Sequence, residues 1–180
     1  MPTLATILIV PGWQNSGPAH WQTLWQREHP EYVRVEQRDW ERPVRAEWVA
    51  TLEAAVVGAG GLVALVAHSL GCLAVAHWAA VGSPAAHAVV GALLVAPPDV
   101  ERGGALPEVA GFAPLPLAPL PFRSILVASE NDPYCDIAVS RRLAAAWGSQ
   151  LVSLGAAGHI NTDAGYGPWP AGEALLASLL

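Results

Sequence analysis

Hydrophobic positions along the chain gather into short, nearly continuous runs that Gly and Pro residues separate. Apolar runs without a polar alternation are typical of strands that are buried on both faces of a sheet. The pattern predicts six strands, at 4–10, 32–37, 62–67, 88–96, 124–129 and 150–154.

The segments between these runs carry apolar residues at helical spacing. In the segment 44–57, Ala46, Val49 and Leu52 recur every three residues, and they would form one apolar face of a helix. Pro18 would lie in the first turn of the first helix, where a missing N–H is tolerated. The predicted helices are 18–29, 44–57, 70–81, 137–147 and 170–180.

The alternation of strands and helices predicts the α/β class, with a parallel sheet of about six strands and helices on both faces. Neither an internal repeat nor a linker interrupts it, so we expect one domain over residues 1–180. The segment 97–123, rich in Pro, Gly and Leu, is the one irregular stretch. Ligands of open parallel sheets bind beyond the carboxyl ends of the strands. Functional residues should therefore follow strands directly.

Composition narrows the classes of function. With 53% hydrophobic and 13% charged residues among 180, the chain is not disordered, and it is long enough to bury roughly 70% of its unfolded surface. All nine basic residues are arginine, which excludes a phosphate-binding loop, a pyridoxal Schiff base and a Ser-Lys dyad. The net charge of −6 argues against nucleic-acid binding.

The two cysteines, Cys72 and Cys135, form no CxxC pair and are expected to be small buried apolar residues. No metal-ligand spacing such as HExxH occurs, so we expect neither a metal nor a cofactor. The N-terminus has no basic leader, and no apolar segment approaches the roughly 20 residues that span a bilayer. These features predict a cytoplasmic protein that does not associate with membranes.

Ser69 is the strongest candidate nucleophile. The predicted strand 62–67 runs into the sequence Ala67-His68-Ser69-Leu70-Gly71, and a predicted helix follows at once. This is the strand–turn–helix context of a nucleophile elbow, with Ala67 in place of the more usual first Gly. The turn would leave the Leu70 N–H free at a helix N-terminus to bind an oxyanion.

A serine nucleophile needs a base and an orienting acid, which follow it along the chain in the order acid, then histidine. His159 is the only histidine after residue 87, and it follows the last predicted strand. Asp132 directly follows the strand 124–129, and Pro133 would stiffen its turn. The remaining acids considered are Asp99 as the runner-up, Asp136 as a helix cap and Glu130 at the rim of the sheet.

The turn after the first strand should supply a second oxyanion donor. Gly12 permits an unusual backbone there, and the Trp13 N–H is the first candidate, with Gln14 the second.

Four residues are candidates for lining the substrate site. His20 belongs to the loop and helix after the first strand, and Trp40 follows the second strand. Gln14 lies beside the predicted oxyanion donor. Phe112 belongs to the segment 97–123, whose apolar residues could hold an acyl chain or equally be plain core contacts; these are Leu106, Phe112, Leu115, Leu117 and Leu120.

Taken together, the chain resembles the small serine hydrolases of the α/β-hydrolase superfamily that include YdeN and retinoblastoma-binding protein 9. The resemblance spans nearly the whole chain, and it implies a compact α/β-hydrolase fold without leading antiparallel strands. The family pattern places the nucleophile on Ser69, the acid on Asp132 and the base on His159. It is carried by ILIVPGWQNSGPAHW at 7–21, QRDWERP at 37–43, VAHSLG at 66–71, SENDPYC at 129–135 and GHINTDAGYGPWPAG at 158–172.

The sequence thus predicts a serine hydrolase, and more specifically a carboxylesterase. Its expected partner is a small-molecule substrate, an ester with a small or medium acyl group. Two alternatives stay open: a peptidase or acyl-transfer activity on the same residues, and a non-catalytic interaction domain on a hydrolase fold. The sequence leaves the oligomeric state open.

Overall fold

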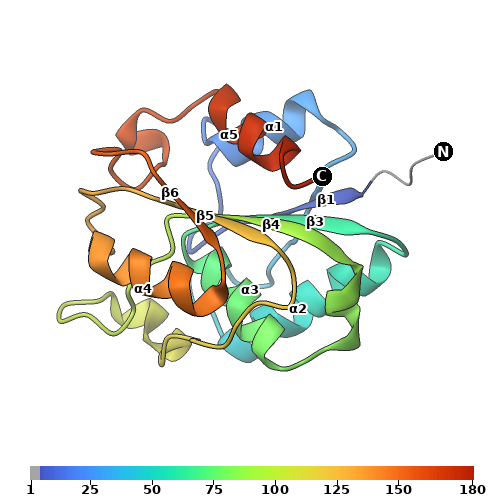
Figure 1. The fold of residues 1–180 in the computed structure, drawn as a ribbon, viewed down its shortest axis with the longest axis horizontal. Helices are drawn as coiled ribbons and strands as arrows, with labels where there is room; N and C mark the ends of the chain where they lie inside the picture. The colour runs from blue at the N-terminus through green and yellow to red at the C-terminus, as the bar shows by residue number, and fades with distance from the viewer. Residues whose placement is uncertain (1–4) are drawn as a thin grey trace.

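A computed structural model describes residues 5–180; Leu4, within the first predicted strand, lies outside the described residues. Six parallel strands form one sheet in the order β2-β1-β3-β4-β5-β6 (Figure 1). The strands are β1 (Thr6–Val10), β2 (Val33–Arg34), β3 (Val63–His68), β4 (Val89–Val95), β5 (Ser124–Ala128) and β6 (Gln150–Ser153).

Helices cover both faces of the sheet. Helices α1 and α5 lie on one face, whereas α2, α3 and α4 lie on the other (Figure 1). The predicted fold class is therefore confirmed. The helices are α1 (Trp21–Glu28), α2 (Arg45–Gly58), α3 (Leu70–Ala80), α4 (Ile137–Trp147) and α5 (Pro170–Ala177).

Each face of the sheet has its own apolar core. On the side of α2, α3 and α4, Trp48, Leu73 and Trp147 pack against the strands. On the side of α1 and α5, Trp21 and Trp25 pack against Trp169, the N-cap residue of α5. Alternate residues of the strands complete this core. Every residue of β3 is buried, which explains why its sequence is apolar rather than alternating.

Three elements differ by three or more residues from the prediction, and one of them is α5, which ends at Ala177 and not at 180. The second strand, at the edge of the sheet, is only two residues long, because only two residues of β1 pair with it. The first helix begins at Trp21, because His20 is its N-cap and accepts a hydrogen bond from the Gln22 N–H at 3.2 Å. Pro18 consequently lies in the turn before the helix and not in its first turn.

The segment 97–123 is exposed over much of its length, but several of its apolar residues pack into the core. It contains a 3₁₀ helix at Pro107–Phe112, and Phe112 and Leu115 are buried in the core on the side of α2 and α3. Leu117 is exposed. Of the two alternatives for this segment, core contact is the one that describes Phe112 and Leu115.

Both cysteines are free and buried, as predicted. Burial raises the pKa of the Cys135 thiol to about 11 and also raises that of Cys72, so neither is a thiolate near neutral pH. Among residues 5–180, none of the helices combines the length and the apolar character that crossing a membrane requires.

Candidate active site

The candidate site lies where the strand order reverses, at the carboxyl ends of β1 and β3. These strands are neighbours, with Val10 paired to Ala67, while the chain continues from β1 to β2 on one side and from β3 to β4 on the other. The crevice at such a switch point is the usual ligand site of an open parallel sheet. Ser69 follows β3 directly and has φ 53° and ψ −126°. This strained backbone, rare for a residue with a side chain, is that of a nucleophile elbow.

Two glycines allow the first turn to approach the elbow closely. A Cβ on Gly71 would lie 2.3 Å from the Val10 carbonyl oxygen, so only glycine lets the start of α3 pack on the end of β1. A Cβ on Gly12 would lie 2.9 Å from the Ser69 Cβ and 3.1 Å from the Leu70 nitrogen. The backbone after β1 therefore runs directly beside the serine.

Ser69, His159 and Asp132 form a continuous line of hydrogen bonds. His159 Nε2 lies 2.8 Å from Ser69 Oγ, and Nδ1 lies 2.9 and 3.0 Å from the two Asp132 oxygens. A carboxylate only accepts, so Nδ1 carries the proton and Nε2 is left to accept the Ser69 hydroxyl. The side chains of Asp132 and His159 are only 3% and 9% exposed, so water competes little for these bonds.

The turn that carries Asp132 also holds the loop that carries His159. Ser129 Oγ accepts the Ala157 N–H at 2.9 Å, and Asn131 Oδ1 accepts the Gly158 N–H at 2.7 Å. The Ser129 hydroxyl in turn donates to Asn131 Oδ1 at 2.9 Å. Two loops that are distant in the chain are thus fixed to each other within a few residues of the acid and the base.

His159 is also held through its backbone. The carbonyl of His159 accepts from His68 Nε2 at 2.9 Å, and the Ile160 carbonyl accepts from Trp21 Nε1 at 2.9 Å. His68 is not among the site residues that the sequence predicts. Its partner lies in a different loop, and no local sequence signal could have identified the contact.

The histidines near His159 are uncharged. Burial lowers the pKa of His68 well below its ordinary value, and the neighbouring imidazoles lower it further. Burial, with smaller contributions from Arg34 and His159, lowers the pKa of His20 to about 4. Neutral His68 must carry its proton on Nε2, because the partner of that atom is a carbonyl oxygen.

Two backbone N–H groups stand free beside Ser69. Within residues 5–180, neither the Trp13 N–H nor the Leu70 N–H makes a hydrogen bond. The Gln14 N–H, in contrast, donates to the Trp40 carbonyl at 3.0 Å. Of the two candidates after β1, Trp13 is therefore the one whose N–H is not already used.

The four predicted substrate residues differ in burial: Gln14 and Trp40 are accessible, whereas His20 and Phe112 are buried. Gln14 is exposed, with its side chain bonded to Glu41, and Trp40 is half-buried against Trp48. His20 is only 6% exposed and its ring packs on His68.

Phe112 is the clearest correction. It is 0% exposed and contacts Trp48 and His77, and His77 lies eight residues, or about 12 Å of helix, beyond Ser69. In this structure, neither Phe112 nor His20 presents a surface to a substrate.

The other acids occupy separate positions. Asp99 accepts the Glu101 N–H at 3.0 Å and its own N–H donates to the Tyr134 carbonyl. Asp136 caps α4 by accepting the Ala138 N–H at 2.7 Å, as predicted. Glu130 accepts from the Ser153 hydroxyl at 3.3 Å. Asp132 is the acid that the fold brings to His159.

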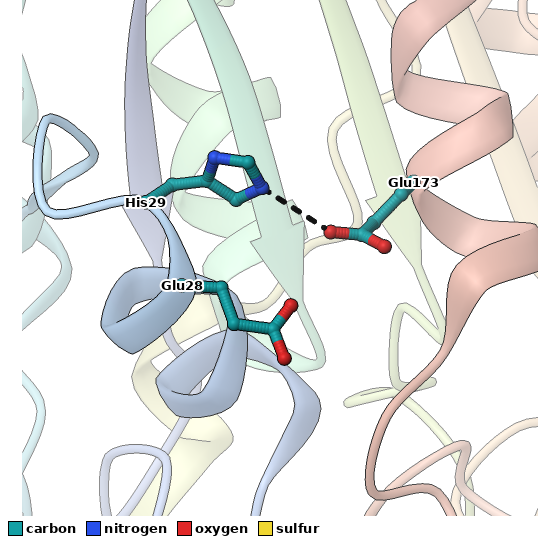
Figure 2. A group of neighbouring side chains, drawn as sticks. All are labelled: Glu28, His29 and Glu173. Carbon is teal, nitrogen blue, oxygen red and sulfur yellow. Dashed lines mark ion pairs between the residues drawn. The ribbon is translucent and has the colours of Figure 1, made fainter.

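One cluster in residues 5–180 places three potential metal ligands together, and it lies apart from Ser69. The ligand atoms of Glu28, His29 and Glu173 all lie within 4.8 Å of one another (Figure 2). His29 Nε2 is 3.5 Å from Glu173 and Nδ1 is 3.4 Å from Glu31. Both ring nitrogens thus already face carboxylates, and the contact joins the end of α1 to α5.

The family model of serine hydrolases matches residues 7–178. The chain belongs to the serine hydrolase family. The protein is therefore an enzyme, and we refer to it below as the hydrolase.

Solved structures agree with this assignment. A YdeN-like hydrolase from Pectobacterium atrosepticum is 34% identical in sequence to this chain, with a TM-score of 0.85. The match covers 97% of this chain and 90% of the Pectobacterium protein. The ydeN gene product of B. subtilis is 19% identical over 98% of each chain, with a TM-score of 0.77. The esterase RhEst1 from Rhodococcus is 14% identical over 97% of this chain and 90% of its own, with a TM-score of 0.68. Identities of this last size show a shared fold. None of the curated protein sequences compared with the chain matches it.

Proposed function

We propose that the hydrolase is a carboxylesterase that cleaves small or medium acyl esters by a Ser69–His159–Asp132 triad. The observation that carries this proposal is the unbroken line of hydrogen bonds from Ser69 Oγ through the imidazole to the Asp132 carboxylate. The free N–H groups of Trp13 and Leu70 beside Ser69 support it.

In the first half of the reaction, Ser69 Oγ attacks the carbonyl carbon of the ester and its proton moves to His159 Nε2. The carbonyl oxygen becomes an oxyanion, which the Trp13 and Leu70 N–H groups bind. Each such donor contributes about 2.7–4 kcal/mol to the transition state. The intermediate then collapses, the bond to the alcohol oxygen breaks, and the alcohol leaves with the proton from Nε2. The acyl group remains on Ser69.

In the second half, a water molecule gives a proton to His159 Nε2 and attacks the acyl carbon. Collapse of this intermediate breaks the bond to Ser69 Oγ, which takes the proton back, and the acid is released. Asp132 keeps its negative charge throughout; it holds the Nδ1 proton and stabilises the imidazolium.

The ester class is supported by the site and by one neighbour. Ser69 is only half-buried at the carboxyl end of β3, and RhEst1, which shares the fold, is named an esterase. The two free, buried cysteines fit a reducing compartment such as the cytoplasm.

Labelling with a fluorophosphonate tests the triad. We expect one adduct on Ser69, found by intact mass and peptide mapping, and none in Ser69→Ala or His159→Ala. Asp132→Asn should slow labelling by about 10⁴-fold, because the imidazole loses the partner that fixes its tautomer.

Asp99→Asn is the matched control, since Asp99 also follows a strand but contacts Glu101 and Tyr134 instead of His159. It should label as fast as the unchanged protein. A folded protein that takes up no label at all, or equal loss in the two Asp→Asn variants, would contradict the proposed triad.

A further inference from the structure

Tyr134 is an exposed aromatic residue beside the imidazole. Its ring centroid lies 4.6 Å from that of His159, with the planes at 69°. The only other aromatic ring in contact with His159 among the described residues is His68, at 4.9 Å. His68 is buried, whereas Tyr134 is 40% exposed. Of the two rings, Tyr134 is thus the one that a molecule arriving from solvent can touch.

The backbone of Tyr134 is fixed although its side chain is exposed. The Tyr134 N–H donates to Asp132 Oδ1 at 2.9 Å, and its carbonyl accepts the Asp99 N–H at 2.9 Å. The preceding carbonyl, of Pro133, accepts from Arg102. The Cα of Tyr134 is therefore anchored close to the acid and the base, while its hydroxyl forms no hydrogen bond within residues 5–180.

The chemistry determines which part of an ester meets this ring. The proton on His159 Nε2 passes to the departing alcohol oxygen, so that oxygen must lie within hydrogen-bonding reach of Nε2. The acyl oxygen lies instead at the Trp13 and Leu70 N–H groups. A substituent on the alcohol oxygen therefore extends from the edge of the imidazole, next to the exposed ring.

We propose that Tyr134 forms the leaving-group subsite and favours substrates whose leaving group is aromatic. This inference rests on the proposed Ser69–His159–Asp132 function and adds the substrate side on which selectivity is exerted. Aromatic rings gain from edge-to-face or offset contact with one another, and the exposed phenol ring against the His159 imidazole offers that contact to an aryl group. A small leaving group does not reach it.

Two phosphonates with identical alkyl and alkoxy groups test this assignment. One carries fluoride and the other 4-nitrophenolate as its leaving group. In both, Ser69 Oγ forms a bond to phosphorus, the leaving group departs with the bonding electrons as an anion, and the serine proton remains on His159. The second-order rate constants of Ser69 labelling are measured by intact mass for each protein.

We expect Tyr134→Ala to lower the rate constant for the 4-nitrophenyl reagent by about three- to tenfold, the size of a lost aromatic contact. Its rate constant with the fluoride reagent should be unchanged, and Tyr134→Phe should restore both. Tyr32→Ala is the matched control, because Tyr32 is an aromatic residue stacked on His29, away from the site, and should alter neither rate constant.

Other outcomes separate the two proposals. Equal loss with both reagents in Tyr134→Ala, or no loss with either, would overturn the leaving-group subsite while Ser69 labelling still supports the triad. If neither reagent labels Ser69 in the unchanged protein, the proposed function fails and the subsite fails with it.

Discussion

Gly12 lies where the turn after β1 passes the nucleophile. The contact is so close that any side chain there would meet Ser69 and the backbone of Leu70. Trp13 follows Gly12 in the chain and Leu70 follows Ser69, so the spacing of their N–H groups depends on the absence of a Cβ at Gly12.

We predict that Gly12→Ala lowers kcat by about 10²-fold while the protein remains folded. The added methyl must push the turn away from Ser69, and displacing one donor of an oxyanion hole has an effect of this size. The measurement is kcat on a short-chain ester, with circular dichroism and urea unfolding to show that the fold is intact.

Gly17→Ala is the control for this substitution. It lies in the same turn, but nothing is within 4 Å of its hypothetical Cβ. Equal kcat values in the two variants would show that the close approach at Gly12 is irrelevant to catalysis.

For single residues, the sequence predicts those that follow a predicted strand and lie in a known motif. It misses residues whose role depends only on contacts with distant parts of the chain. Ser69 stands between a buried strand and a helix, and Asp132 and His159 each follow a strand. The structure brings the three together. His68 and Asn131 have no such context, because each contacts the His159 loop only after the sheet has formed. Chain contacts of this kind depend on tertiary structure.

Helix α4 depends on its N-cap residue for stability. Asp136 Oδ1 accepts the Ala138 N–H, which satisfies one of the donors that the first turn of a helix leaves unpaired. The helix packs Leu143 and Trp147 into the core, so loss of the cap weakens an element on which that core depends.

We predict that Asp136→Ala lowers the free energy of unfolding by about 1 kcal/mol, measured by urea denaturation. Asp136→Asn retains an acceptor at the cap and should lose much less. Labelling of Ser69 should be unchanged in both variants. A labelling rate that falls with stability would indicate that the cap also positions the Asp132 turn.

The elements themselves are predicted closely for most of the sheet, and the main differences lie at β2, at the start of α1 and at the end of α5. The predicted helix 137–147 matches α4, and the ends of β3, β4 and β5 differ by at most one residue. The edge strand β2 is much shorter than predicted, because only Leu8 and Ile9 of β1 pair with it. Helix α1 starts three residues late, because a histidine is its cap in place of the usual Ser, Thr, Asp or Asn.

The whole molecule carries a dependence on pH that originates in its buried histidines. The folded pKa of His20 is about 4 and that of His68 is also lowered, chiefly by burial. The unfolded chain has histidines of ordinary pKa, about 6.5. Below that pH the unfolded chain binds protons that the folded protein does not, so acid favours unfolding. For His20 the loss runs from about pH 6.5 to its folded pKa of about 4.

Lowering the pH from 7 to 5 should reduce the free energy of unfolding of both the unchanged protein and His20→Asn. We predict that the reduction is about 1–2 kcal/mol smaller in His20→Asn. Asparagine can still accept the Gln22 N–H as an N-cap, but it does not titrate. The measurement is urea unfolding at both pH values. His87→Asn, at an exposed histidine, should behave as the unchanged protein does. An identical loss in His20→Asn would show that other groups determine the acid sensitivity.

Residues with unfavourable backbone conformations lie beyond the carboxyl ends of the strands. Within residues 5–180, five residues other than glycine have positive φ, and every one follows the carboxyl end of a strand: Gln14, Asn15, Ser69, Ala96 and Ile160. Each such conformation costs about 1–3 kcal/mol, and the loops around Ser69 and His159 keep them in place. This enzyme therefore has a built-in trade-off between thermal resistance and turnover. Efforts to raise its melting temperature should redesign the turns at the amino ends of the strands, where the backbone can be improved without disturbing the chemistry.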